Sequence, residues 1–152
     1  MRLSFAGAPE VRTTRAAVWR HLLDPHFIAS CLPAVESVTV LEPTRFRIVS
    51  GFGVGFLRLD FNVIVDLYDL VEPESARLRM HGTAPGTTVD MESQIAIEEL
   101  GAELVRLRWE AASTVHGTAA AVGRRIMEGA ARRLTAMFWE EFARNAEAQR
   151  PR

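Results

Sequence analysis

The chain has 152 residues, a length typical of one compact domain, and a formal net charge of −1 from 18 basic and 19 acidic residues. This balance excludes the basic surface that proteins need to hold nucleic acid, so no nucleic acid is expected as a partner. Its single cysteine, Cys31, excludes an internal disulfide and a cysteine-based metal cluster. We expect a single domain over residues 1–152 that carries no cofactor and no metal.

The chain is predicted to begin with a strand and two short helices. Residues 2–7 alternate between apolar and polar side chains, as a half-buried strand does. Thr14 then stands where a helix cap is needed before the helical pattern of residues 16–23. Asp24 and Pro25 follow as a second cap with proline at the first helical position, which predicts another short helix.

From Val35 to about residue 115 the hydrophobic period becomes two, which predicts about six further strands. The clearest case is residues 56–68, where leucine, phenylalanine and valine alternate with arginine, aspartate and asparagine. Such alternation is typical of an antiparallel sheet that has one apolar face and one solvated face.

The turn at residues 84–87 predicts how two of these strands pair. It sets His81 opposite Asp90 and Arg79 opposite Glu92 on the solvated face. This is a prediction of register only.

Residues 117–148 return to the helical period and predict one long helix. At ~1.5 Å per residue it is on the order of 45 Å long, enough to cross several strands. The apolar face of this helix is predicted to contain Val122, Ile126, Met127, Ala130, Leu134, Met137, Phe138 and Phe142. One long helix against one antiparallel sheet indicates an α+β fold, and a helix held off a curved sheet encloses a cavity.

Two segments resemble the CoxG-like family of carbon monoxide dehydrogenase, a branch of the START-like (SRPBCC) helix-grip superfamily. They are residues 24–38, DPHFIASCLPAVESV, and residues 123–134, GRRIMEGAARRL, which lead to the aromatic Phe138. The resemblance implies a curved antiparallel sheet of about seven strands wrapped around a long C-terminal helix, with two short helices after strand 1. It also implies a hydrophobic cavity and an accessory role in the maturation or membrane recruitment of a molybdenum hydroxylase such as carbon monoxide dehydrogenase. A hydroxylase partner and a peripheral membrane contact are therefore expected.

The inward-facing residues are rich in methionine and aromatic side chains, which suit an adaptable pocket but also an ordinary core. We expect the pocket to bind a quinone-like or lipid-like molecule. Trp109 lies mid-strand opposite the helix, and Phe52 and Phe56 stand among glycines in a segment that can close over a guest. The predicted ligand-binding residues are Trp109, Phe61, Met80, Met91, Met127, Leu134, Phe138, Phe52 and Phe56.

Catalysis is not expected, because alternation points nearly every strand carboxylate to solvent and leaves only Ser93 and Ser113 as polar residues facing inward. Two alternatives stay open. One is an interaction-only docking protein with a filled core, and the other is a polyketide-cyclase-like enzyme that uses Ser93, Ser113 or His116 with bound water.

The sequence contains neither an export signal nor a membrane span. Its N-terminus has no apolar core followed by a cleavage site, and no uncharged run approaches about 18 residues. A cytoplasmic location is therefore expected.

Overall fold

The structure is a computed structural model that describes residues 1–54 and 57–149, with the backbone alone for residues 52–54 and 57. In chain order the elements are β1 (Arg2–Gly7), β2 (Glu10–Val11), α1 (Arg15–Leu22), α2 (Pro25–Ser30), β3 (Val35–Glu42), β4 (Arg45–Val54), β5 (Leu57–Val71), β6 (Ser75–Ala84), β7 (Thr87–Gly101), β8 (Leu104–Gly117), the 3₁₀ turn η1 (Thr118–Val122) and α3 (Arg124–Ala148).

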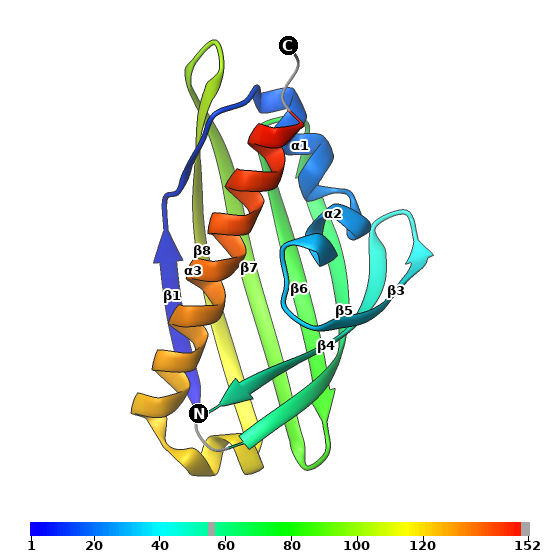
Figure 1. Cartoon of the computed structure of the whole chain (residues 1–152), viewed down its shortest axis with the longest axis vertical. Helices are drawn as coiled ribbons and strands as arrows, with labels where there is room; N and C mark the ends of the chain where they lie inside the picture. Colours follow the sequence, from blue (N-terminus) through cyan, green and yellow to red (C-terminus); the bar gives the residue numbers. More distant parts are fainter. Residues whose placement is uncertain (55–56, 150–152) are drawn as a thin grey trace.

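The strands form one antiparallel sheet that curves around α3 (Figure 1). Seven of them are hydrogen-bonded in the order β1-β8-β7-β6-β5-β4-β3, and the two-residue β2 pairs with β8. The helix α3 lies across one face of the sheet, and α1 and α2 lie on that same side near its C-terminal end (Figure 1). This is the predicted α+β helix-grip architecture, with a path of seven strands and two short helices near the start of the chain.

The predicted helix caps are present at both short helices. The Thr14 hydroxyl oxygen accepts a hydrogen bond from the backbone N–H of Ala17 at 3.1 Å and so begins α1. The Asp24 carboxylate accepts one from the backbone N–H of His26 at 3.0 Å, and Pro25 is the first residue of α2. Each cap satisfies an N–H that a helix leaves without an internal partner, which is why these short sequence signals located both helices.

The β6–β7 hairpin has the predicted register. His81 pairs with Asp90 and Arg79 with Glu92 across the two strands. The His81 Nδ1 lies 2.6 Å from Asp90 Oδ1, and the Arg79 Nε lies 3.5 Å from Glu92 Oε1. All four side chains are exposed, so these pairs favour the register more than they add to overall stability.

The long helix begins later than the predicted residue 117. Thr118–Val122 form the 3₁₀ turn η1, and α3 starts only at Arg124. The break falls at Gly123, whose φ of +99° lies outside the right-handed helical region and is readily adopted only by glycine. The periodicity of the surrounding alanines continues across the break, so the pattern of apolar residues did not reveal it.

Two residues predicted on the buried stripe of the helix are instead exposed. The side chain of Ile126 is 41% exposed and that of Met137 is 48% exposed. At 3.6 residues per turn, both lie roughly a quarter turn from the line through Met127, Leu134 and Phe138 that faces the sheet. The predicted stripe was therefore too wide.

The core divides into three clusters of buried side chains. The α1 cluster joins α1 and α2 to β2, β6, β7, β8 and the C-terminal half of α3, where Phe142 has no exposed surface. The η1 cluster joins β1, β5, β8 and η1 to the first turns of α3, through Met127 and Ala130. The β4 cluster joins α2 to β4 and β5. The two ends of α3 are thus packed in different clusters.

A buried histidine in the α1 cluster makes stability depend on pH. The His21 ring stacks on Phe27 with centroids 3.9 Å apart and meets the edge of Phe142. Burial, assisted by the positive charge of Arg20 and opposed by Asp24, lowers the pKa of His21. Above about pH 6.5 the imidazole is neutral in both the folded and the unfolded chain, whereas below it the unfolded chain binds a proton that the folded chain resists.

We therefore expect the free energy of unfolding to fall as the pH drops from about 6.5 toward the lowered pKa of His21. Thermal unfolding at pH 7.5 and pH 5.0 measures this loss in the wild type and in His21→Phe, which keeps an aromatic ring in the stack. The loss is expected to be smaller in the variant. An equal loss in both proteins would show that other groups carry the pH dependence.

Candidate functional site

The middle of the inner face of the sheet lies between the α1 cluster and the η1 cluster. Strand register places two rows of inward-facing side chains there. One row consists of Met80, Met91 and Ser113, and the other of Leu78, Ser93, Ala111 and Phe5. We call these two rows, together with Ala131 and Leu134 of α3, the central zone.

The apolar side chains of the central zone face α3 and are nevertheless only partly buried. Met80, Met91 and Ala111 all keep accessible surface, although their strands lie in the interior of the sheet. Neither Met91 nor Ala111 packs into any of the three clusters formed by the described residues. Described side chains therefore leave part of the surface of these residues uncovered.

The side chains of α3 that face the sheet are also less buried in the middle of the helix than at its ends. Met127 and Ala130 are buried at one end and Phe142 at the other, whereas Leu134 and Phe138 between them are only partly buried. The backbone of α3 comes within 8 Å of η1, β4, β2 and α1. The helix is thus most deeply buried near its two ends, and its middle faces the central zone.

A stacked pair of indoles bounds the central zone toward the α1 cluster. Trp109 on β8 and Trp139 on α3 have ring centroids 6.1 Å apart and planes 28° from parallel. Their contact joins the helix to the sheet. The Trp109 Nε1 is buried and has no hydrogen-bond partner among the described residues, and it lies against Gly7 of β1, where an added Cβ would come within 2.7 Å of it. Glycine at position 7 is therefore what lets this indole lie against β1.

The close approach of Gly7 to Trp109 gives a testable expectation. Gly7→Ala should displace the Trp109 ring and lower the free energy of unfolding by about 1–3 kcal/mol, as overpacking typically does. Urea unfolding measures the loss, and near-ultraviolet circular dichroism reports the changed stacking of the indoles. Gly101→Ala is the matched control, because an added Cβ there would meet its nearest neighbour, Leu104, at an unstrained 4.0 Å. Unchanged stability and spectrum in Gly7→Ala would contradict this packing.

The polar groups on the inner face are few and neutral. Ser93 is 7% exposed and Ser113 is 9% exposed, and the Ser93 hydroxyl donates a hydrogen bond to the backbone carbonyl of Glu110 at 2.8 Å. The strand carboxylates Asp60, Asp90 and Glu110 are exposed on the opposite face, as alternation predicted. No charged side chain of a described strand residue faces the central zone.

The single thiol and the histidine at the end of β8 lie away from the central zone. Burial raises the pKa of the Cys31 thiol, so the reactive thiolate is disfavoured. Cys31 donates to the Phe27 carbonyl at 3.3 Å and lies inside the α1 cluster. His116 is exposed near the end of β8. The described residues also include no group of three or more histidine, cysteine or acidic side chains able to hold a metal ion.

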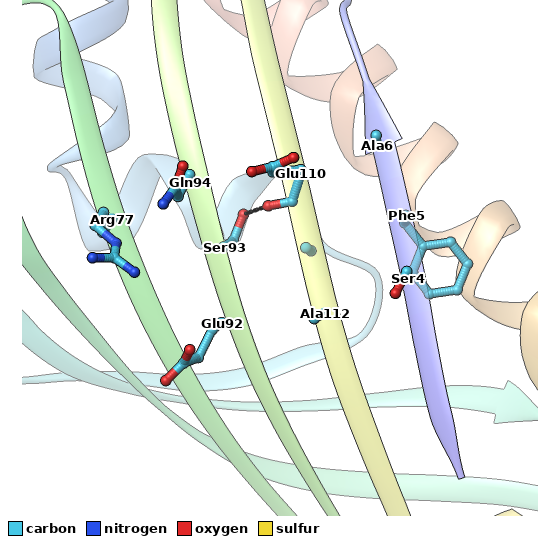
Figure 2. Close-up of a pocket in the computed structure, with 10 residues that line it drawn as sticks. Ser4, Phe5, Ala6, Arg77, Glu92, Ser93, Gln94, Glu110 and Ala112 are labelled. Carbon is cyan, nitrogen blue, oxygen red and sulfur yellow. Dashed lines mark hydrogen bonds between the residues drawn. The ribbon is translucent and has the colours of Figure 1, made fainter.

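A depression of about 470 Å³ lies on the outer face of the sheet, on the side away from α3 (Figure 2). It forms where small side chains of β1 and β8, among them Ser4, Ala6 and Ala112, stand beside longer charged ones, and Phe5, Ser93 and Ala111 also border it. Arg77, Glu92 and Glu110 border it (Figure 2); the Arg77 side chain is half-buried, and those of Glu92 and Glu110 are exposed. An open depression with charged walls does not suit an apolar molecule.

The structure distributes the predicted ligand-binding residues over three places. Phe61 and Met127 are buried in the η1 cluster, while Trp109 and Phe138 pack against the α1 cluster. Met80, Met91 and Leu134 belong to the central zone. Of the two predicted lid residues, Phe56 lies outside the described residues, and the side chain of Phe52 is likewise not described.

Sequence reasoning missed three contributors to this region. Ala111 and Phe5 stand on the correct face by alternation, and the strand register that makes them neighbours could have identified them. The packing of Trp109 against Gly7 could not be predicted from alternation, because it is a contact between residues about 100 positions apart. Alternation reveals which face a residue occupies but not which distant residue covers it.

No helix in the described part of the chain is long and apolar enough to cross a membrane.

Comparison with known proteins gives one family and several similar folds. The model of the carbon monoxide dehydrogenase CoxG family matches residues 7–147. No curated protein matches the chain in sequence. A conserved protein from Geobacillus kaustophilus has a structure similar to this chain at a TM-score of 0.89, with 22% identity over 96% of each chain.

Two further solved structures share the architecture. The Zhui aromatase/cyclase from Streptomyces sp. R1128 matches at a TM-score of 0.74 with 18% identity, over 98% of this chain and 96% of its own. A START superfamily protein from Mycobacterium smegmatis matches at 0.73 with 13% identity, over 95% of this chain and 97% of its own. At these identities the likeness establishes the START-like fold alone.

Proposed function

The chain belongs to the carbon monoxide dehydrogenase CoxG family, and from this premise we propose that it binds a hydrophobic small molecule between α3 and the inner face of the sheet. The guest is a quinone-like or lipid-like molecule, and the protein carries it without changing it chemically. The observation that carries the proposal is the accessible surface of Met91, Ala111 and Leu134, apolar side chains that face inward and belong to none of the clusters of the described core.

Burial of apolar surface supplies the affinity in this proposal. A guest that covers the central zone gains roughly 25 cal/mol per Å² of apolar surface removed from water, before the cost of ordering guest and side chains. The facing methionines, Met80 on β6 and Met91 on β7, are unbranched and adapt to guests of different shape. The uncovered apolar surface of the central zone favours a carrier over an interaction-only protein, because a filled core would cover these side chains.

One solved structure of similar fold is an aromatase/cyclase, so an enzymatic function is the alternative to a carrier. The described residues favour the carrier. The polar residues of this chain that could act as catalytic groups are poorly placed for proton transfer. The Ser93 hydroxyl already donates to a backbone carbonyl, and His116 is exposed at the end of β8. Neither serine has a histidine or carboxylate within hydrogen-bonding distance of its hydroxyl among the described residues. A carrier needs none of these groups.

Membership of the family supports a narrower role. We propose that the loaded protein acts in the cytoplasm as an accessory factor for the maturation or membrane recruitment of a molybdenum hydroxylase such as carbon monoxide dehydrogenase. Affinity capture of the tagged protein from its own host tests this part, with the expected result that a molybdenum hydroxylase is enriched. Capture without any hydroxylase would contradict the accessory role and leave the carrier function standing.

Native mass spectrometry of the protein, purified gently from its own host, tests the carrier function. We expect a non-covalent adduct that has the mass of a quinone or a lipid and that organic solvent releases. A bare chain mass, together with no binding of added quinones or lipids to the purified protein, would contradict the proposal.

A further inference from the structure

One inward-facing hydroxyl in the central zone has no hydrogen-bond partner among the described residues. Ser113 lies on β8 with its side chain 9% exposed, and the register sets it between Met91 of β7 and Leu3 of β1. Its strand neighbours on the same face are Ala111 and Val115, so apolar side chains surround it. Within the part of the chain that the structure describes, the Ser113 hydroxyl makes no hydrogen bond.

The other buried hydroxyls of the sheet face are satisfied. The Ser50 hydroxyl donates to the carbonyl of Pro33 at 2.6 Å, and that of Ser93 donates to the carbonyl of Glu110 at 2.8 Å. The Thr87 hydroxyl oxygen accepts a hydrogen bond from the backbone N–H of Ala119 at 3.2 Å. Buried polar groups are normally paired in this way. The Ser113 oxygen differs, since it is not among the described buried atoms that lack a partner and so keeps surface accessible to a further hydrogen bond.

Thr13 offers a useful contrast. Its hydroxyl oxygen is buried and has no hydrogen-bond partner among the described residues, and its side chain has no exposed surface. Ser113 instead lies beside the partly exposed Met91 and Ala111. Its hydroxyl is therefore placed to meet a molecule that occupies the central zone.

We propose that Ser113 donates a hydrogen bond to an uncharged oxygen of the bound molecule, and so selects guests that carry a carbonyl or hydroxyl group on an apolar body. This inference rests on the proposed carrier function. A neutral oxygen fits because no charged side chain of a described strand residue faces the central zone, and burying a carboxylate without a counter-charge is strongly unfavourable. The apolar body then extends over Met91 and Met80 toward Leu134.

Two probes of one shape separate the hydrogen bond from the apolar contact. Menadione (2-methyl-1,4-naphthoquinone) and 2-methylnaphthalene share a bicyclic skeleton and differ in the two carbonyl groups. Titration calorimetry of both with the wild type, Ser113→Ala and the control Ser93→Ala measures the effect. We expect Ser113→Ala to weaken menadione about three- to tenfold, the range of one hydrogen bond, and to leave 2-methylnaphthalene within about twofold.

Ser93→Ala is expected to affect the two probes equally, because the Ser93 hydroxyl is already engaged with Glu110. Ser113→Cys keeps the size of the side chain but hydrogen-bonds weakly, so it should behave as Ser113→Ala does. The unliganded Ser113→Ala protein should also unfold at no lower temperature than the wild type, since the hydroxyl has no partner within the protein to lose.

Three results would overturn the inference. If Ser113→Ala weakens the binding of both probes equally, or of neither, Ser113 does not donate a hydrogen bond to the guest. The proposed binding site between α3 and the sheet would still stand. A lower unfolding temperature in the unliganded Ser113→Ala protein shows that the hydroxyl has a structural role. Failure of the wild type to bind either probe contradicts the carrier function itself and this inference with it.

Discussion

Phe142→Ala should lower the free energy of unfolding by about 3–5 kcal/mol, the cost typical of removing a fully buried phenylalanine ring. The Phe142 side chain has no exposed surface and meets the edge of Phe27 at a centroid distance of 5.1 Å. It also contacts the rings of Phe138 and Trp139 on its own helix. Because this cluster fixes the C-terminal half of α3 to α1 and α2, the truncation removes packing that other elements do not replace. Denaturant unfolding followed by far-ultraviolet circular dichroism measures the loss.

Met137→Ala is the matched control on the same helix. Its side chain is 48% exposed and lies outside the stripe that faces the sheet, so its truncation should change stability by less than about 0.5 kcal/mol. Similar losses in the two variants would mean that α3 is not attached through the Phe142 ring, and the account of how the helix packs at its ends would then be wrong.

Ala111→Trp should abolish binding of a ring-shaped guest, with a loss of at least about 100-fold, while the fold is retained. The Ala111 side chain points to the inner face by strand register, so an indole in its place enters the space that the proposed guest needs. Titration calorimetry with menadione measures the affinity, and the thermal midpoint confirms that the variant is folded.

Ala112→Trp is the matched control for Ala111→Trp. Ala112 is the next residue of the same strand and lines the depression on the outer face (Figure 2). The same substitution there adds an equal side chain to the opposite side of the sheet, so menadione should bind as it does to the wild type. If Ala112→Trp blocks binding and Ala111→Trp does not, the guest occupies the outer depression and the proposed site is wrong.

The sequence was most informative where a local pattern has a single physical solution. The caps at Thr14 and Asp24 located the two short helices, and the pairing of His81 with Asp90 followed from the turn between β6 and β7. Period-two alternation sorted the strand side chains correctly, with the carboxylates outside and Ser93 and Ser113 inside. These features depend on neighbours along the chain or directly across a hairpin.

The rest depends on contacts between distant segments. The alanines before α3 gave no warning that Gly123 would break the helix, and the hydrophobicity of Met137 suggested burial that its angular position does not allow. Phe61 and Trp109, both predicted ligand contacts, pack in separate clusters on either side of the central zone, which alternation alone does not reveal. The burial of α3 depends on the different elements that pack against its two ends, which is why the composition of its middle could not reveal it.

The methionine methyl groups provide the most direct test of a guest between α3 and the sheet. The chain has five methionines, of which Met80 and Met91 lie in the central zone and Met137 is exposed on α3. In a protein labelled with ¹³C at the methionine methyls, menadione should shift the Met91 and Met80 resonances and leave that of Met137 unchanged. Shifts confined to Met137, or none at saturating menadione, would contradict the account.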